Sequence, residues 1–223
     1  MENESHPREM KGGKTNTELY FQIGIIAVLV LVIAFNLGKI YSNSGAGIAT
    51  GIGEVSASNI IPKGMPLVYG EELEVNYDDI SADNPKLADA TIQKLTAYED
   101  MQLDNATMTR YIRIGNSIAC EYCCGAQSLI FSNGQRACGC AHSYAMRGLA
   151  KYLLINHPEM SDIDILSELG KWKVLFFPGI HEQKAKALEA KGIDSTDYIN
   201  LASNLYRGIE QGQTSGGEMV GGC

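Results

Sequence analysis

Residues 120–142 read CEYCCGAQSLIFSNGQRACGCAH, which contains five of the six cysteines of the 223-residue chain and ends on a histidine. Inside this segment, SLIF at 128–131 is followed by the turn-forming residues SNG at 132–134. A short apolar run before such a turn predicts a β-hairpin, which would bring Cys138 back beside Cys123. We therefore expect a small Cys-rich β-hairpin within the fold.

The donor residues of this segment form two sets with the spacing of metal ligands. Cys120 and Cys123 make a C-x2-C pair, with which a tight turn directs two thiolates at one ion. Cys138, Cys140 and His142 are spaced i, i+2 and i+4, so an extended backbone places all three side chains on one side. These residues are the predicted metal ligands, and a tetrahedral zinc site would use four of them.

Two further residues are candidate additional ligands. Cys124 follows Cys123 directly, so in an extended chain its side chain points to the opposite side. Met146 lies four residues after His142 and would add a thioether if the helix there begins early, although a core methionine is the simpler interpretation. Thiolate and imidazole donors suit Zn(II), Cu(I) or an iron–sulfur centre. We expect Zn(II) first, because knuckle and hairpin arrangements are usual for it.

Disulfide bonding is the alternative explanation of the cysteines. Cys120–Cys140 together with Cys123–Cys138 is one sensible pairing, and it would make the chain a disulfide-stapled interaction domain outside the cytoplasm. Cys120 and Cys123 also form the C-x-x-C motif of a thiol–disulfide oxidoreductase, but no helix clearly begins there to lower the pKa of a thiol. Both alternatives stay open beside a structural or metal-handling role.

The N-terminal part contains an uncharged and mostly apolar stretch. No residue from Leu19 to Gly38 is charged, and a helix of that length, at about 1.5 Å per residue, crosses the roughly 30 Å hydrocarbon core of a bilayer. We predict a single transmembrane helix over 19–41, with the lipid bilayer as a partner. Arg8, Lys11 and Lys14 precede the stretch, so the positive-inside tendency favours an N-terminus inside the cell. The expected location is the cell membrane, with an extracytoplasmic globular domain.

Composition and apolar spacing divide the chain into segments of different character. We expect a cytoplasmic tail at 1–18, the transmembrane helix at 19–41, a Gly-rich linker at 42–54, a helical metal-binding domain at 55–208 and a disordered tail at 209–223. Within the domain, apolar periodicity and capping residues predict helices over 87–101, 105–114, 143–156, 161–177, 181–190 and 195–206. The predicted fold class is therefore mainly α.

Two groups of residues on the later helices are assigned from their pattern. Trp172, Phe176 and Phe177 lie on the most apolar helix and are predicted to be core. Five lysines are interleaved with acidic residues at helical spacing, which is typical of a solvated helix face. They are Lys171, Lys173, Lys184, Lys186 and Lys191.

Charge and missing motifs exclude several function classes. The formal net charge is −8 with an isoelectric point near 5.0, and nucleic-acid binding needs a basic surface that displaces counterions. The chain has no nucleophile elbow, phosphate-binding glycine loop or HExxH motif, so no pattern argues for a hydrolase, kinase or dehydrogenase. The expected partners are the bilayer and a protein, either an interaction partner or a metal donor or acceptor.

Four stretches resemble a group of uncharacterised, mainly archaeal, membrane-anchored proteins. They are CEYCCG at 120–125, ACGCAHSYAMRGLAKYLL at 137–154, LGKWKVLFFPG at 169–179 and LVYGEELEVNYDDIS at 67–81. The CGC at 138–140 is also similar to bacterial lipoproteins named for a PCYCGC motif, although Gln135 and Arg136 stand where that motif has Pro and Cys. The resemblances imply export and metal or thiol chemistry, and they assign no ligand.

Overall fold

The computed structural model describes residues 20, 22, 25–26, 59–211 and 219–221, and the chain divides into two compact units, 1–53 and 54–223. In the first unit, the described residues Tyr20, Gln22, Ile25 and Ile26 are helical and exposed. Across all described residues, no helix combines the length and apolar character that a membrane crossing requires. Nearly all of the predicted span at 19–41 lies outside the described residues.

The prediction of a membrane anchor is corrected accordingly. A single-pass helix over 19–41 finds no support in the described residues, and neither does the extracytoplasmic location that was derived from it. The prediction relied on hydropathy and on the loop-charge rule, and both are local sequence signals. The cytoplasmic tail at 1–18 and the linker at 42–54 also fall outside the described residues.

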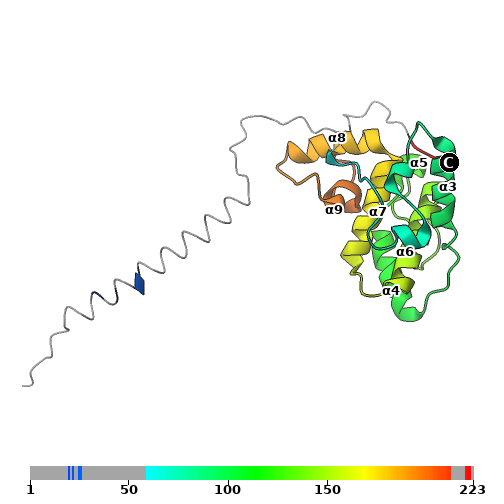
Figure 1. The fold of residues 1–223 in the computed structure, drawn as a ribbon, viewed down its shortest axis with the longest axis horizontal. Helices are drawn as coiled ribbons and strands as arrows, with labels where there is room; N and C mark the ends of the chain where they lie inside the picture. Colours follow the sequence, from blue (N-terminus) through cyan, green and yellow to red (C-terminus); the bar gives the residue numbers. More distant parts are fainter. Residues whose placement is uncertain (1–19, 21, 23–24, 27–58, 212–218, 222–223) are drawn as a thin grey trace, which may run out of the picture. The chain divides into compact units, whose positions relative to one another are not determined.

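The second unit is mainly helical, as predicted (Figure 1). Its described elements are α2 (Gly70–Leu73), η2 (Tyr77–Asp79), α3 (Pro85–Thr96), α4 (Asn105–Asn116), α5 (Glu121–Cys124), α6 (Ala141–Asn156), α7 (Asp162–Phe176), α8 (Pro178–Glu189), α9 (Tyr198–Ala202) and η3 (Asn204–Tyr206). The predicted helices all have counterparts, although their bounds shift by several residues.

Helix α6 lies at the centre of this unit and packs against α3, α4 and α7 (Figure 1). It is buried on more than one face, since Met146, Leu149 and Leu153 are each at most 1% exposed and so is the polar Arg147. The helix begins at Ala141, two residues before the predicted start, because Cys140 is its N-cap and accepts from the Ser143 backbone. This early start places the end of the CGC stretch against the core.

Helix α7 joins the irregular N-terminal part of the unit to the core. Ser161 and Asp164 form a capping box at its start, as the sequence pattern predicts. Trp172 is fully buried, as expected, and its Nε1 donates to the Tyr69 hydroxyl at 2.7 Å. That hydroxyl donates to the Glu168 carboxylate at 2.9 Å, so α7 holds the segment before α3 through side-chain hydrogen bonds.

The predicted Cys-rich hairpin is wrong, because the described residues contain no strand. The chain does turn near Gly134, which has a φ of 81°, but only an isolated bridge joins Ile130 and Arg136. The backbone N–H of Leu129 donates to carbonyl groups at the end of α4 and just after it, and the Leu129 carbonyl accepts from Arg147. The two legs share backbone hydrogen bonds from Phe131 N to Gln135 O and from Ala137 N to Leu129 O. Because the Leu129 N–H is directed at α4, this pairing does not extend into strands.

The last predicted helix is shorter than expected. Helix α9 ends at Ala202, and extended backbone at Ser203 separates it from η3. The Ala202 carbonyl accepts a hydrogen bond from Lys173 Nζ at 2.9 Å, and the Ser203 side chain accepts from Leu205 N. The predicted tail at 209–223 is described only at 209–211 and 219–221, where Glu210 and Val220 are each 4% exposed.

Helices α3 and α6 cross closely at Gly148. A Cβ added there would overlap the carbonyl oxygen of Leu95, which belongs to the backbone of α3. We expect Gly148→Ala to lower the free energy of unfolding by roughly 2–3 kcal/mol, because backbone must move to relieve the overlap. Urea unfolding monitored by circular dichroism measures this change.

Gly139→Ala is the matched control, because its added Cβ meets nothing within 4 Å. We expect it to change the free energy of unfolding by less than about 0.5 kcal/mol. Equal stability of the two variants would contradict a close approach at Gly148.

Candidate metal centre

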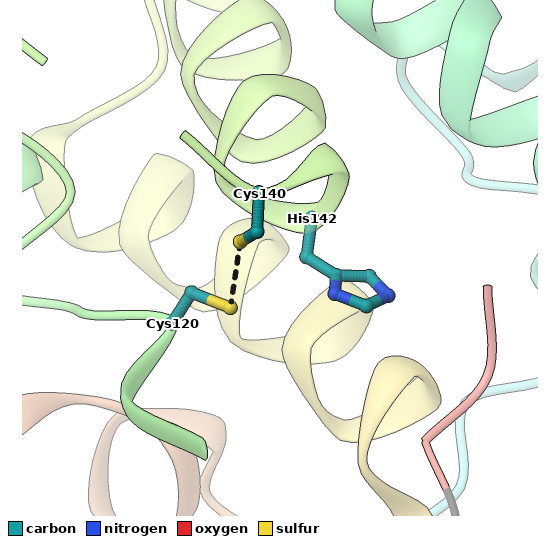
Figure 2. Close-up of side chains that lie close together, drawn as sticks. All are labelled: Cys120, Cys140 and His142. Atoms are coloured by element: carbon teal, nitrogen blue, oxygen red, sulfur yellow. Dashed lines mark hydrogen bonds between the residues drawn. The ribbon is translucent and has the colours of Figure 1, made fainter. Parts of the chain in front are cut away.

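Three of the predicted ligands meet at the N-terminal end of α6. Cys120 precedes α5, Cys140 caps α6, and His142 lies in the first turn of α6 (Figure 2). The two sulfur atoms are 3.4 Å apart, and both lie within 4.8 Å of a ring nitrogen of His142. Cys120 and His142 are fully buried, and Cys140 is 7% exposed. These three side chains can hold a metal ion.

Cys140 is held by donors from its own helix. The backbone N–H and the hydroxyl of Ser143 lie 3.4 and 3.3 Å from its sulfur. The hydrogen bond between the two thiols lowers the pKa of Cys140 and raises that of Cys120, and burial adds to the rise at Cys120. A nearby cation would favour the thiolate form of both cysteines.

The orientation of His142 leaves one ring nitrogen facing the sulfur atoms. Its Nε2 is 2.8 Å from the carbonyl oxygen of Val220, which can only accept, so Nε2 carries the hydrogen. Nδ1 then has a free lone pair, is buried and has no hydrogen-bond partner among the described residues. The rings of Phe176 and Phe177 pack against the imidazole with centroids at 4.6 and 5.1 Å. Figure 2 shows Nδ1 on the side of the sulfur atoms.

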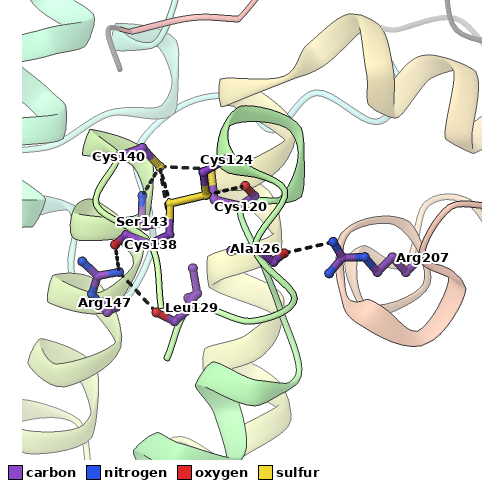
Figure 3. Close-up of a disulfide and its surroundings, with 9 residues drawn as sticks. All are labelled: Cys120, Cys124, Ala126, Leu129, Cys138, Cys140, Ser143, Arg147 and Arg207. Atoms are coloured by element: carbon purple, nitrogen blue, oxygen red, sulfur yellow. Dashed lines mark hydrogen bonds between the residues drawn. A yellow bond between two sulfur atoms is a disulfide. The ribbon is translucent and has the colours of Figure 1, made fainter. Parts of the chain in front are cut away.

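A second sulfur group lies next to the first (Figure 3). Cys124 and Cys138 form a disulfide, and the Cys138 sulfur is 3.4 Å from that of Cys140. Cys124, Cys138 and Cys140 have sulfur atoms within 4.8 Å of one another, and Cys124 is exposed. The sequence had suggested the pairs Cys120–Cys140 and Cys123–Cys138. Neither is formed, since Cys120 and Cys140 are free thiols and Cys138 pairs with Cys124.

Two other predicted donors stand apart from these groups. Cys123 is disulfide-bonded and half-buried, and it belongs to neither group of three donors. Met146 is 1% exposed and belongs to the hydrophobic core, in agreement with the simpler interpretation of this residue.

Buried charges lie under Cys120, where the sequence predicted a solvated face. Lys173 and Lys184 are both fully buried, so the prediction is wrong for these two. Lys191 is exposed, and Lys171 and Lys186 are half-buried. Lys173 Nζ is 3.2 Å from Glu121 and lies over the ring of Tyr122 at 5.1 Å. Burial lowers the pKa of Lys173 to about 8, while the Glu121 carboxylate opposes this shift. The positive charge of Lys173 in turn favours a thiolate at Cys120.

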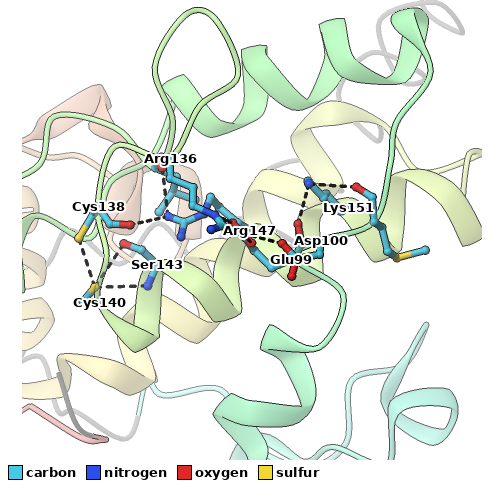
Figure 4. Close-up of polar contacts among 10 residues, drawn as sticks. Glu99, Asp100, Arg136, Cys138, Cys140, Ser143, Arg147 and Lys151 are labelled. Carbon is cyan, nitrogen blue, oxygen red and sulfur yellow. Dashed lines mark hydrogen bonds and ion pairs between the residues drawn. The ribbon is translucent and has the colours of Figure 1, made fainter.

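An ion-pair network anchors the CGC stretch to α6 (Figure 4). Arg147 is fully buried, donates to Glu99 at 2.8 Å and also donates to the backbone carbonyls of Leu129 and Cys138. Arg136 forms a second, bidentate pair with Glu99. The backbone around Cys138 is therefore held from α6 without any contribution from its sulfur.

The donor set of the centre suits a soft or borderline ion. Two thiol sulfurs and one imidazole nitrogen favour zinc or copper over calcium or magnesium, which prefer oxygen ligands. The chain matches no family model, no curated protein and no solved structure. The chemistry of the site must therefore be argued from its own residues.

Several residues that shape the centre were missed in the sequence. Ser143 was assigned as a helix cap, yet it donates to Cys140, which is the true cap. Arg147 and Glu99 carried a weak signal, since a lone arginine on an apolar helix face needs a buried acidic partner. Nothing in the sequence indicated Val220, because it contacts His142 through its backbone carbonyl and not through its side chain.

Replacing Glu99 by glutamine should leave Arg147 buried without a counter-charge. We expect Glu99→Gln to lower the free energy of unfolding by about 3 kcal/mol near neutral pH. Burial opposes ionisation of Glu99, but Arg136 and Arg147 outweigh it and lower its pKa below 4.5. The contribution of its carboxylate is therefore present above pH 4.5 and is lost as the pH falls through the lower folded-state value.

Urea unfolding of both proteins between pH 3 and pH 7 tests this expectation, with the two curves converging at the acid end. Asp100→Asn is the control, because the Asp100 side chain is 90% exposed although it also contacts Arg136. We expect a change below about 1 kcal/mol for the control. A pH-independent gap between wild type and Glu99→Gln would contradict the ionic role.

Proposed function

We propose that this chain binds one thiophilic metal ion between Cys120, Cys140 and His142, with zinc preferred over copper. The observation that carries the proposal is the His142 ring. Its Nδ1 is buried, lacks a hydrogen-bond partner among the described residues and lies within reach of two thiol sulfurs. An unpaired polar atom in the interior is costly, and a bound ion would satisfy it.

The second nitrogen of His142 supports the same conclusion. Histidine ligands of metals usually donate their other N–H to a carboxylate or a backbone carbonyl, which orients the ring. Here Val220 O accepts from Nε2 at 2.8 Å, while Phe176 and Phe177 pack on the ring. The ligand atom is therefore already oriented toward the sulfur atoms before an ion binds.

Charge and donor count favour zinc. Two thiolates carry two negative charges and the imidazole is neutral, so a divalent ion makes the complex neutral. A neutral group costs less free energy to bury than a charged one. Two cysteines and one histidine also form a donor set of zinc sites that keep the fourth position open. Copper(I) would leave one net negative charge on the buried complex, and the nearby Lys173 is already paired with Glu121.

The surroundings favour metal handling over a purely structural role. The hydrophobic core that contains Trp172, Leu149 and Ile114 extends well beyond the centre, so the fold does not depend on an ion. A structural site usually has four protein ligands, whereas the described residues bring three free donors together here. An open coordination position is what ligand exchange with a donor or acceptor needs.

Metal analysis of the full chain tests the proposal. We expect native mass spectrometry after zinc loading to show about one zinc per chain, and copper(I) to compete less well. Cys120→Ser, Cys140→Ser and His142→Ala should each abolish binding. Chelation should lower the melting temperature without unfolding the protein, since a ligand at about a thousand times its Kd adds roughly 4 kcal/mol of stability.

His157→Ala is the matched control, because His157 lies at the end of α6 and pairs with Glu72 rather than with a sulfur. It should bind zinc as the wild type does. Full zinc binding by folded His142→Ala would refute the assignment of the imidazole as a ligand. Circular dichroism of each variant separates loss of the site from loss of the fold.

A further inference from the structure

Cys140 belongs to two groups of potential ligands at once. Its sulfur is 3.4 Å from Cys120 in the inner group and 3.4 Å from Cys138 in the outer group. The outer group consists of Cys124, Cys138 and Cys140, whose sulfur atoms lie within 4.8 Å of one another. In the disulfide-bonded state, two of these three sulfurs cannot act as thiolates.

We propose that reduction of the Cys124–Cys138 disulfide creates a second metal site in the outer group, with the Cys140 thiolate bridging both ions. The inference deepens the proposed function, because it assumes that the inner group binds an ion. It assigns the disulfide a role as a redox control of metal capacity. The class of ligand is a divalent thiophilic ion, for which zinc is the probe.

The reduction step is balanced by a dithiol reductant. Its thiolate attacks one sulfur of the disulfide, and the other sulfur leaves as a thiolate. The second thiol of the reductant then attacks the reductant's own sulfur in the mixed disulfide, and the remaining protein cysteine leaves as a thiolate. The reductant ends as a cyclic disulfide, and Cys124 and Cys138 end as thiols, so two electrons and two protons have moved. Zinc then replaces the thiol protons. Cys124 is exposed, which gives both the reductant and the ion access.

The backbone that carries the outer group is held by contacts other than the disulfide. Arg147 donates to the Cys138 carbonyl at 2.9 Å, and Cys140 is fixed as the cap of α6. Beyond Cys124, Arg207 donates to the carbonyl of Ala126 at 2.9 Å (Figure 3). The sulfur atoms therefore stay near one another once the bond between them is broken.

Charge balance favours the filled pair of sites. Thiolates at Cys120, Cys124, Cys138 and Cys140 carry four negative charges, which two divalent ions neutralise. The inner ion then has two sulfurs and the His142 nitrogen, and the outer ion has three sulfurs. A thiolate sulfur has enough lone pairs to bind two ions, so sharing Cys140 requires no further donor.

Zinc stoichiometry before and after reduction tests the inference on the full chain. The protein is treated with a small dithiol, desalted without oxygen, loaded with zinc and examined by native mass spectrometry. We expect zinc per chain to double, from about one to about two. Wild-type protein that stays at one zinc, with Cys124 and Cys138 shown to be free by alkylation, would overturn the inference.

Single variants separate the two sites. Cys124→Ser changes an exposed residue and should remain at one zinc after reduction, whereas Cys123→Ser, outside both groups, should still reach two. Cys140→Ser should lose both ions. Two zinc ions in reduced Cys124→Ser would also refute the outer site.

Failure of the inner site gives a different zinc count from failure of the outer site. If the inner group binds nothing, oxidised wild type binds no zinc, and reduction adds one ion that Cys124→Ser removes. Cys120→Ser removes a ligand of the inner group alone, so it should bind no zinc in the oxidised state and one zinc after reduction. The oxidised state thus tests the inner site, and the increase on reduction tests the outer one.

Discussion

The start of α6 is the constraint on which the candidate centre depends. Cys140 caps this helix, hydrogen-bonds with the backbone N–H and the hydroxyl of Ser143, and has a sulfur that belongs to both ligand groups. Because α6 is packed against α3, α4 and α7, the core fixes the position of that cap. The donors are therefore preorganised by the fold, which reduces the ordering that metal binding would otherwise require.

Much of the helical fold follows from local signals in the sequence. Apolar periodicity, the Ser161 capping box and Pro178 at a helix boundary all act within one or two turns, so they can be recognised without tertiary contacts. Cys120, Cys140 and His142, which meet at the start of α6, were predicted as ligands together with Cys123 and Cys138, which lie outside this group. Their spacing indicated the chemistry but could not show which sulfurs would pair as a disulfide.

The features that could not be predicted all depend on distant partners. The expected hairpin legs share two backbone hydrogen bonds, but Leu129 also binds α4 and Arg147 of α6, so no strand forms among the described residues. Lys173 lies among residues with helical charge spacing, yet it is fully buried, because it pairs there with Glu121, which is 52 positions away. Val220 reaches His142 from 78 positions away through a backbone carbonyl, which no side-chain pattern records.

The division of the sulfurs into two groups follows from a change of backbone conformation. Cys138 and Cys140 precede the helix, whereas His142 lies inside its first turn, so the i, i+2, i+4 set does not share one extended face. Beyond Ala141 the helical backbone turns His142 toward Cys120, while Cys138 is left beside Cys124. Cys140 stands at the junction and contacts both sides. A helix start two residues later would have kept the three donors on one extended face, and the disulfide would then remove Cys138 from the same ligand set as His142.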